Sequence, residues 1–225
     1  GRVRVLLPEF EFPADGVHIR WPDAPMDQEY RHHRYRLAAF AAFARANRLD
    51  RVVMDAPRAR IGIVTAGKSH LDVCQALDEL GIDEALAARI GIRLYKVAMP
   101  WPLEPEGIRR FAEGLEEVLV VEEKRAVVEP QLKEHLYGWR ADVRPLVVGK
   151  FDEAGNWILP SAGELRPSRI AQVLADRLAR FLPDEPGLAE RIRARVAHLR
   201  QLEDASSGKA AIERKPTFCS GCPHN

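Results

Sequence analysis

The sequence predicts a three-layer α/β/α domain whose five-stranded mixed sheet has a first strand that runs antiparallel to the others. Apolar strand-like segments alternate with helical segments between residues 71 and 150, a pattern typical of a largely parallel sheet with helices on both faces. The two segments before them, 51–55 and 60–65, are separated by only four residues. That connection is too short for a crossover helix, so we expect these two strands to pair as an antiparallel hairpin.

The chain before the sheet divides into two parts. Four prolines interrupt residues 1–27, which we therefore expect to be extended. Residues 28–49 contain neither proline nor glycine, and apolar side chains recur there at near-helical spacing, which predicts one long helix. We interpret residues 1–49 as a linker and helix from the end of a preceding domain.

The elements after the first two strands follow in order. Apolar periodicity predicts further strands over residues 93–98, 117–122 and 143–150. It predicts helices over residues 71–80, 106–115, 126–137, 167–181 and 186–203. We therefore divide the chain into an α/β domain at 50–165, a helical extension at 166–205 and a final linker segment at 206–225.

Composition and charge exclude several classes of protein. The 34 basic and 33 acidic residues leave a formal charge of +1, which gives no field for nucleic acid or an anionic membrane. The longest apolar run, residues 37–44, has eight residues and is too short to span a bilayer. Three cysteines and no visible signal peptide favour a cytoplasmic protein. The chain begins without Met and ends within a motif, so we expect a fragment of a longer protein.

Residues 62–69 match the phosphate-loop pattern G-x-x-x-x-G-K-[ST]. A phosphate loop needs residues that are free to wrap around the phosphates, whereas Ile63 to Thr65 belong to a predicted strand. We therefore expect no nucleotide site here. Lys68 and Ser69 still lie between the carboxyl end of a strand and the start of a helix, where an anion can bind. The alternative is a glycine turn in which Ser69 only caps the helix.

Two loops and one cysteine complete the candidates in the α/β domain. Trp101 lies between prolines after a strand, and we expect it to be buried against a neighbouring domain rather than stacked on a ligand. The charged residues 122–125 end another strand, where they are either solvated or able to meet a ligand or a domain partner. Cys74 falls on the apolar stripe of a helix and is predicted to pack in the core.

The last residues contain a Cys-x-x-Cys pair, Cys219 and Cys222, around a glycine. This spacing lets both sulfurs face one metal or cluster, but zinc needs four ligands and a cubane cluster needs four thiolates. The pair is therefore half of a metal or cluster site, a redox dithiol or two ordinary thiols.

Several of these segments together resemble the middle of indolepyruvate ferredoxin oxidoreductase in its long single-chain bacterial form. The resemblance extends over residues 60–73, 92–105, 117–125, 131–139 and 218–225. Its most specific parts are Val-Val-Glu-Glu-Lys at 120–124 and Cys-Ser-Gly-Cys-Pro-His-Asn at 219–225. The resemblance implies that residues 50–165 form a domain similar to the transketolase C-terminal domain, which has a mixed sheet with an antiparallel first strand.

The resemblance also implies what the parent enzyme does. Such an enzyme oxidatively decarboxylates an aryl 2-oxo acid on thiamine diphosphate and Mg2+, passes electrons through [4Fe-4S] clusters to ferredoxin and releases the acyl group to coenzyme A. It implies that Cys219 and Cys222 are cluster ligands and that His224 begins the thiamine diphosphate domain.

On this interpretation the chain itself is a structural and interface domain of a homo-oligomer, and it is catalytically silent alone. The rival interpretation is a non-catalytic α/β binding module whose cysteine pair holds zinc together with a partner chain.

Overall fold

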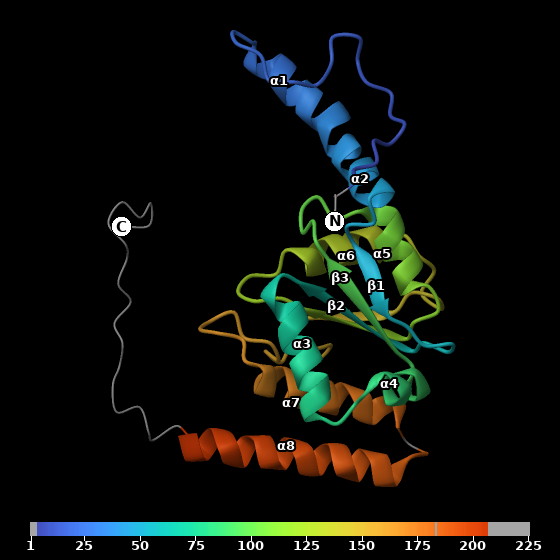
Figure 1. Ribbon diagram of the computed structural model, residues 1–225, viewed down its shortest axis with the longest axis vertical. Helices are drawn as coiled ribbons and strands as arrows, with labels where there is room; N and C mark the ends of the chain where they lie inside the picture. The colour runs from blue at the N-terminus through green and yellow to red at the C-terminus, as the bar shows by residue number, and fades with distance from the viewer. Residues whose placement is uncertain (1–3, 183, 207–225) are drawn as a thin grey trace.

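The computed structural model describes residues 4–182 and 184–206 (Figure 1). Their centre is a five-stranded sheet with the strand order β1-β3-β2-β4-β5. Strand β1 is antiparallel to β3, and the other neighbouring strands are parallel. The strands are β1 (Arg51–Met54), β2 (Ile61–Ala66), β3 (Ile92–Val97), β4 (Glu117–Val121) and β5 (Leu146–Val148). The mixed sheet with an antiparallel first strand is therefore confirmed.

The predicted hairpin between the first two strands is wrong. Strand β1 pairs with β3, with Arg51 opposite Lys96, and not with β2. Both sides of β2 are already taken by parallel pairing with β3 and β4, so β1 occupies the free edge of β3. Stepping over one strand requires about 10 Å, which the six residues 55–60 span easily. The connection packs against Gly91, whose Cβ would lie only 2.6 Å from the Arg58 carbonyl oxygen.

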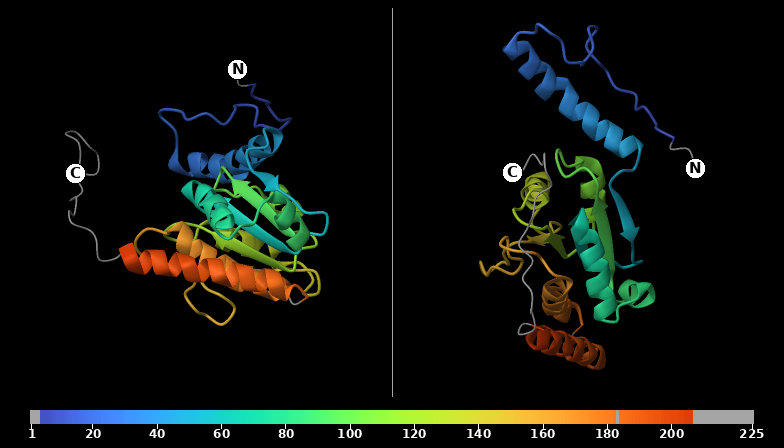
Figure 2. Two further views of the ribbon diagram at one scale, coloured as in Figure 1. Left: turned by 60° about the horizontal axis from the view of Figure 1, so that its bottom comes forward. Right: turned by 60° about the vertical axis from the view of Figure 1, so that its left-hand side comes forward.

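Helices cover both faces of the sheet (Figure 2). One core contains apolar side chains from the sheet and from four helices. These are α3 (Lys68–Glu79), α4 (Glu84–Ile90), α7 (Pro167–Leu178) and α8 (Pro186–Ser206). The fourth of these, α8, packs on the third, α7. The other core lies under α5 (Pro105–Ala112) and α6 (Val128–Tyr137). Strands β2 and β4 are buried along nearly their whole length between these layers, as expected for central parallel strands.

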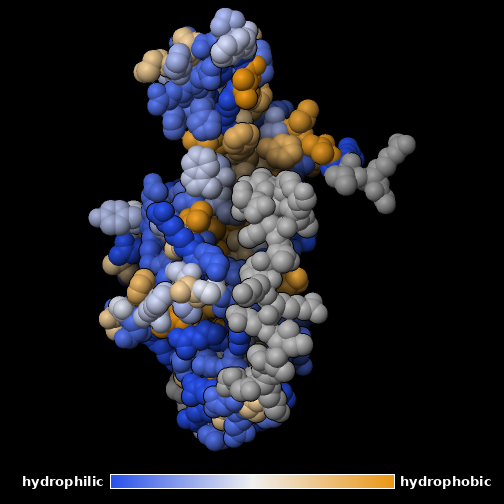
Figure 3. Space-filling view, turned by 90° about the vertical axis from the view of Figure 1, so that its left-hand side faces the viewer, coloured by the Kyte–Doolittle hydropathy of each residue, from blue (hydrophilic) through white to orange (hydrophobic). Residues whose placement is uncertain are grey.

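The N-terminal helix stands away from the sheet (Figure 1). It consists of α1 (Pro25–Arg31), a π-helical turn η1 (His32–Arg36) and α2 (Leu37–Ala46). Proline suits the first position of a helix, so this helix begins earlier than predicted. Apolar side chains gather where this segment meets the body of the domain (Figure 3).

Most predicted elements are present with shifted ends, and one helix was not predicted. Helix α4 has only seven residues and begins after Asp83, whose carboxylate accepts the N–H of Leu86 at 2.8 Å. Strand β5 covers only the middle of the predicted 143–150. Cys74 is half-buried and packs against the first core, which confirms its predicted place. No helix within the described ranges is both long and apolar enough to cross a membrane.

Candidate functional site

The carboxyl ends of the parallel strands meet at one edge of the sheet, which we call the carboxyl edge. Ligand sites of open α/β sheets usually lie at this edge. The loops that begin there follow β2, β3, β4 and β5, and the N-terminal helix joins the domain at the same edge (Figure 1).

The turn after β2 holds Lys68 and Ser69. Lys68 Nζ lies 2.9 Å from Asp72 Oδ2 and 3.4 Å from Glu164 Oε1, and the hydrogen bond to Asp72 raises the pKa of Lys68. Ser69 is buried inside the first turn of α3, whereas the residue that precedes the helix is Gly67, with φ of +55°. The predicted glycine turn is therefore present at Gly67, whereas the predicted capping of the helix by Ser69 is wrong. Binding of an anion by Lys68 and Ser69 stays a prediction.

Residues 62–69 match the sequence pattern of a phosphate loop, but their backbone does not have the structure of one. Residues 61–66 form β2, which is paired on both sides. A Cβ at Gly62 would lie 2.6 Å from atoms of Leu115 and Phe111. The first glycine of the pattern thus allows close packing of the strand against the α5 side of the domain. The expectation that Ile63 to Thr65 are committed to the strand is confirmed.

The loop after β4 is fixed by the carboxylate of Glu122. This side chain is 7% exposed, and its oxygens accept the N–H groups of Val127, Val128 and Glu129 at 2.8–3.2 Å. It therefore satisfies the free N–H groups at the start of α6. Lys124 in the same loop has φ of +59° and donates to the Gly163 carbonyl. Of residues 122–125, only Lys124 and Arg125 are exposed, so a solvated strand end describes those two but not Glu122.

Glu129 and Lys150 join the ends of β4 and β5. Lys150 is 5% exposed; its Nζ donates to the Glu122 carbonyl and its N–H to Glu129 Oε2, the latter at 3.0 Å. Glu129 also pairs with Lys133 at 2.6 Å. Burial lowers the pKa of Lys150 against the opposing effect of the nearby glutamates. A Cβ at Gly149 would overlap the Glu129 carboxylate at 2.2 Å, so only glycine fits there.

The amide of Gln131 connects the loops after β3 and β4. Its Nε2 donates to the carbonyls of Pro100 and Val127 at 2.8 and 2.7 Å, and its Oε1 accepts the N–H of Leu103 at 2.8 Å. Trp101 in the first of these loops is 57% exposed. The described residues therefore do not bury Trp101. Its burial against a neighbouring domain stays a prediction.

Glu104 ties the N-terminal helix to the same edge. Its buried carboxylate accepts the N–H groups of Glu106 and Gly107 at the start of α5. It also pairs with Arg45 of α2 at 3.0 Å. The N-terminal helix is thus joined to the domain through a helix cap.

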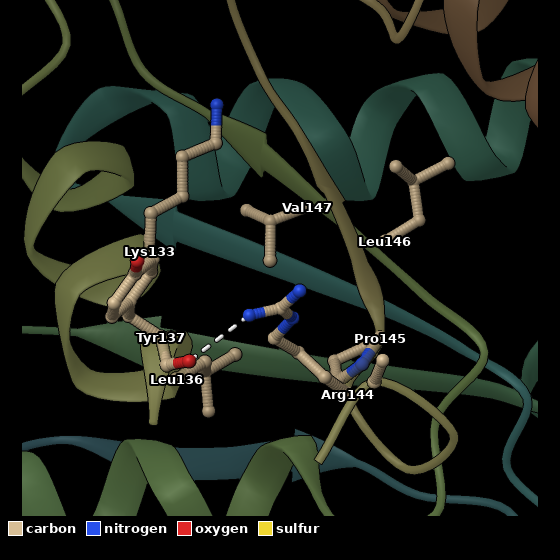
Figure 4. A pocket seen from close by; sticks show the side chains of 8 residues that line it. Lys133, Leu136, Tyr137, Arg144, Pro145, Leu146 and Val147 are labelled. Atoms are coloured by element: carbon tan, nitrogen blue, oxygen red, sulfur yellow. Dashed lines mark hydrogen bonds between the residues drawn. The ribbon is translucent and has the colours of Figure 1, made fainter. Parts of the chain in front are cut away.

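A groove of about 520 Å³ lies beside α6 and β5 (Figure 4). Leu136 and Val147 supply apolar lining, and Lys133 and Arg144 add positive charge. Both cations have partners: Lys133 binds Glu129, and Arg144 Nη1 donates to the Tyr137 carbonyl at 3.0 Å (Figure 4). The groove therefore offers apolar surface but no pair of unpartnered charges.

Taken together, the side chains of Glu104, Glu122, Gln131 and Lys150 bind groups of neighbouring loops at the carboxyl edge and hold these loops in place. Residues 4–182 and 184–206 contain no group of three His, Cys, Asp or Glu side chains that could hold a metal ion. Cys219, Cys222 and His224 lie outside the described residues.

The sequence did not identify Glu129, Gln131 or Lys150 as parts of this edge. A weak signal exists for Lys150, because a lysine so close to an apolar strand lies at the predicted carboxyl edge. No sequence pattern shows that it meets Glu129, because the hydrogen bond joins residues 21 positions apart.

A family model and the curated relatives of this chain carry the same family name. The family model described as "Indolepyruvate oxidoreductase domain" matches residues 51–206. The indolepyruvate oxidoreductase subunit IorA of Thermococcus kodakarensis is 26% identical over 168 residues, which cover 74% of this chain and 22% of that protein. The subunit of the same name from Pyrococcus horikoshii is 28% identical over 167 residues, with the same two coverages. The chain thus spans 22% of the length of these curated relatives.

Two solved structures have a looser likeness. The 2-oxoglutarate:ferredoxin oxidoreductase from Magnetococcus marinus, with 2-oxoglutarate, coenzyme A and succinyl-CoA bound, has a TM-score of 0.45 and 17% identity, and the match covers 69% of this chain and 24% of that one. A split-gene transketolase, an inactive β4 tetramer, has a TM-score of 0.39 and 19% identity, covering 58% and 41%. The family model matches more than half of the sequence, and the chain therefore belongs to the indolepyruvate oxidoreductase domain family.

Proposed function

We propose that this chain is a structural and interface domain of an indolepyruvate ferredoxin oxidoreductase. The observation that carries the proposal is the internally bonded carboxyl edge, where Glu122, Gln131 and Lys150 hold the loops after β3, β4 and β5. Such an arrangement presents a fixed surface, including the exposed Trp101, to another part of the protein. Membership of the family supports the parent activity.

The parent protein, on this proposal, oxidatively decarboxylates an aryl 2-oxo acid. Thiamine diphosphate with Mg2+ supplies the carbanion chemistry when bound, and [4Fe-4S] clusters carry electrons to ferredoxin. Coenzyme A accepts the acyl group. We propose a homo-oligomer, and we assign these cofactors and partners to the longer protein, because the chain spans 22% of its curated relatives.

We propose that Cys219 and Cys222 are two thiolate ligands of one cluster and that His224 begins the thiamine diphosphate domain. Residues 206–225 then form a linker and the start of that domain. Two thiolates are half of what a cubane needs, so the remaining ligands must come from elsewhere in the protein. The sequence alternative is a zinc site shared with a partner chain.

Metal analysis of the full-length protein tests the cysteine assignment. We expect iron with acid-labile sulfide, and we expect Cys219→Ala or Cys222→Ala to remove one cluster and abolish ferredoxin reduction. Cys74→Ala is the matched control, because Cys74 packs against the core of this domain and should leave the iron content unchanged. Zinc in place of iron, or full iron content and turnover in both variants, would show that the assignment is wrong.

A further inference from the structure

A polar cavity, separate from the groove beside α6 and β5, lies on the α5 side of the sheet between α5 and the edge strand β1. We call it the α5–β1 cavity; it has a volume of about 300 Å³. Residues that line it include Asp50, Arg51, Tyr95, Gly107, Arg110 and Phe111. Gly107 leaves the space in front of the tyrosine open, because a Cβ there would lie 2.7 Å from the Tyr95 hydroxyl.

Two polar groups in this cavity lack partners among the described residues. Asp50 Oδ1 accepts the N–H groups of Ala98 and Met99 at 2.7 and 3.1 Å, but its buried Oδ2 has no hydrogen bond. Tyr95 is 2% exposed, and its backbone carbonyl accepts a hydrogen bond from the Thr65 hydroxyl at 3.1 Å. No described residue forms a hydrogen bond with the Tyr95 hydroxyl, but only Asp50 Oδ2 is a buried unpaired atom of this cavity. A buried carboxylate oxygen normally has a partner.

The pKa values of Tyr95 and Asp50 are both raised. Burial raises the pKa of Tyr95 strongly, and the charges of Asp50 and Glu104 add to this effect. The Tyr95 hydroxyl therefore stays protonated and can donate. Burial raises the pKa of Asp50 as well, while the N–H groups of Ala98 and Met99 oppose the change.

The same cavity has two cations without ion pairs. Arg51 and Arg110 are exposed, and neither makes a salt bridge or a side-chain hydrogen bond with a described residue. Arg93, which also lines the cavity, is different: it pairs with Asp55 at 2.7 Å and donates to the carbonyls of Phe111 and Glu113. Two guanidinium groups are thus available for an anion at the cavity, beside Asp50 Oδ2 and the Tyr95 hydroxyl.

We propose that the α5–β1 cavity binds a small phosphate or carboxylate that also carries a hydroxyl group. The anion lies between Arg51 and Arg110, and the hydroxyl donates to Asp50 Oδ2 and accepts from the Tyr95 hydroxyl. A hydroxyl group satisfies both buried groups because it both donates and accepts, whereas an ammonium group only donates. A volume of about 300 Å³ suits a small ligand of this kind. This site is separate from the function proposed above.

Matched pairs of probes test the proposal by isothermal titration calorimetry on the full-length protein. Glycerol 3-phosphate is compared with n-propyl phosphate, and lactate with propionate, so that each pair differs in its hydroxyl groups. We expect one hydroxylated probe to bind about tenfold more tightly than its partner, and the better pair distinguishes phosphate from carboxylate. Equal affinities within both pairs, or no binding at millimolar concentration, would overturn the proposal.

Two variants locate the binding. Tyr95→Phe removes only the hydroxyl and should weaken the hydroxylated probe about fivefold while leaving its partner unchanged. Arg110→Gln should weaken both members of the pair about tenfold. The control is Arg58→Gln, an exposed arginine that does not line the cavity. Unchanged affinity in folded Tyr95→Phe and Arg110→Gln, verified by thermal unfolding, would also contradict the proposal.

Discussion

Strand β4 has a buried glutamate at each end, and the two carboxylates are stabilised in different ways. The side chain of Glu117 is 3% exposed and pairs with Arg177 at 2.5 Å and with Arg180 at 3.2 Å. These two arginines lie 60 and 63 positions away in the sequence. Glu122 accepts three N–H groups from residues five to seven positions away. The first glutamate therefore attaches α7 and the turn after it to the sheet, whereas the second shapes its own loop.

This difference separates a contact that stabilises the fold from one that positions a surface. The α5–β1 cavity adds a third case, because Asp50 Oδ2 has no partner among the described residues. Buried groups that bind one another stabilise the fold, whereas an unpaired buried group needs a partner from outside the described residues. The predictions below test the comparison, beginning with the largest expected effect.

Glu117→Ala should lower the free energy of unfolding by about 3–5 kcal/mol, because it leaves the buried Arg177 without its main partner. Chemical denaturation measures the change. The matched control is the adjacent Glu116→Ala, whose exposed pair with Arg60 should contribute less than about 1 kcal/mol. Equal losses in the two variants would mean that burial of the Glu117 pair has no special effect.

Glu122→Ala should lower the free energy of unfolding by about 1–2 kcal/mol, because the first N–H groups of α6 lose their acceptor. Amide exchange should accelerate at Val127 to Glu129. Glu122→Gln keeps one acceptor oxygen and should lose less, and Glu123→Ala serves as the control. If exchange at these three amides does not change in Glu122→Ala, the carboxylate does not fix the loop.

Substitution of Lys150 should have the smallest effect, which is a change in how the free energy of unfolding depends on pH. The pKa of Lys150 is lowered by burial, so the unfolded chain binds more protons than the folded chain between the two pKa values. The stability of the wild type relative to Lys150→Met should therefore rise from neutral pH toward about 10, the ordinary range of lysine. A difference between the two proteins that stays constant over this range would contradict a lowered pKa.

The sequence predicted the layers of the fold better than the order of its strands. Alternation of apolar and helical segments specifies the strands and the helices between them, and the short connection at 56–59 correctly excluded a crossover helix. It does not specify which strand lies next to β1, because six residues reach either β2 or β3. Helix α4 was missed because seven residues, about two helical turns, give little periodicity.

The candidate site was predicted only as an edge of the sheet. Residues 122–125 and Trp101 were placed at strand ends by pattern, but burial of Glu122 depends on contacts with α6 that no local pattern contains. The same holds for Tyr95 and Asp50, which become a pair of unpaired groups only when β1 lies beside β3. Long-range neighbours therefore decide which polar residues matter.

The most direct test of the account is the turnover of the full-length protein that carries Lys150→Met. If the carboxyl edge only holds loops, kcat for the ferredoxin reduction that we propose for the parent protein should stay within about threefold of the wild type per folded molecule. Thermal unfolding of the same preparation establishes the folded fraction. A loss of about 100-fold or more in a fully folded variant would place Lys150 in the chemistry and contradict the account.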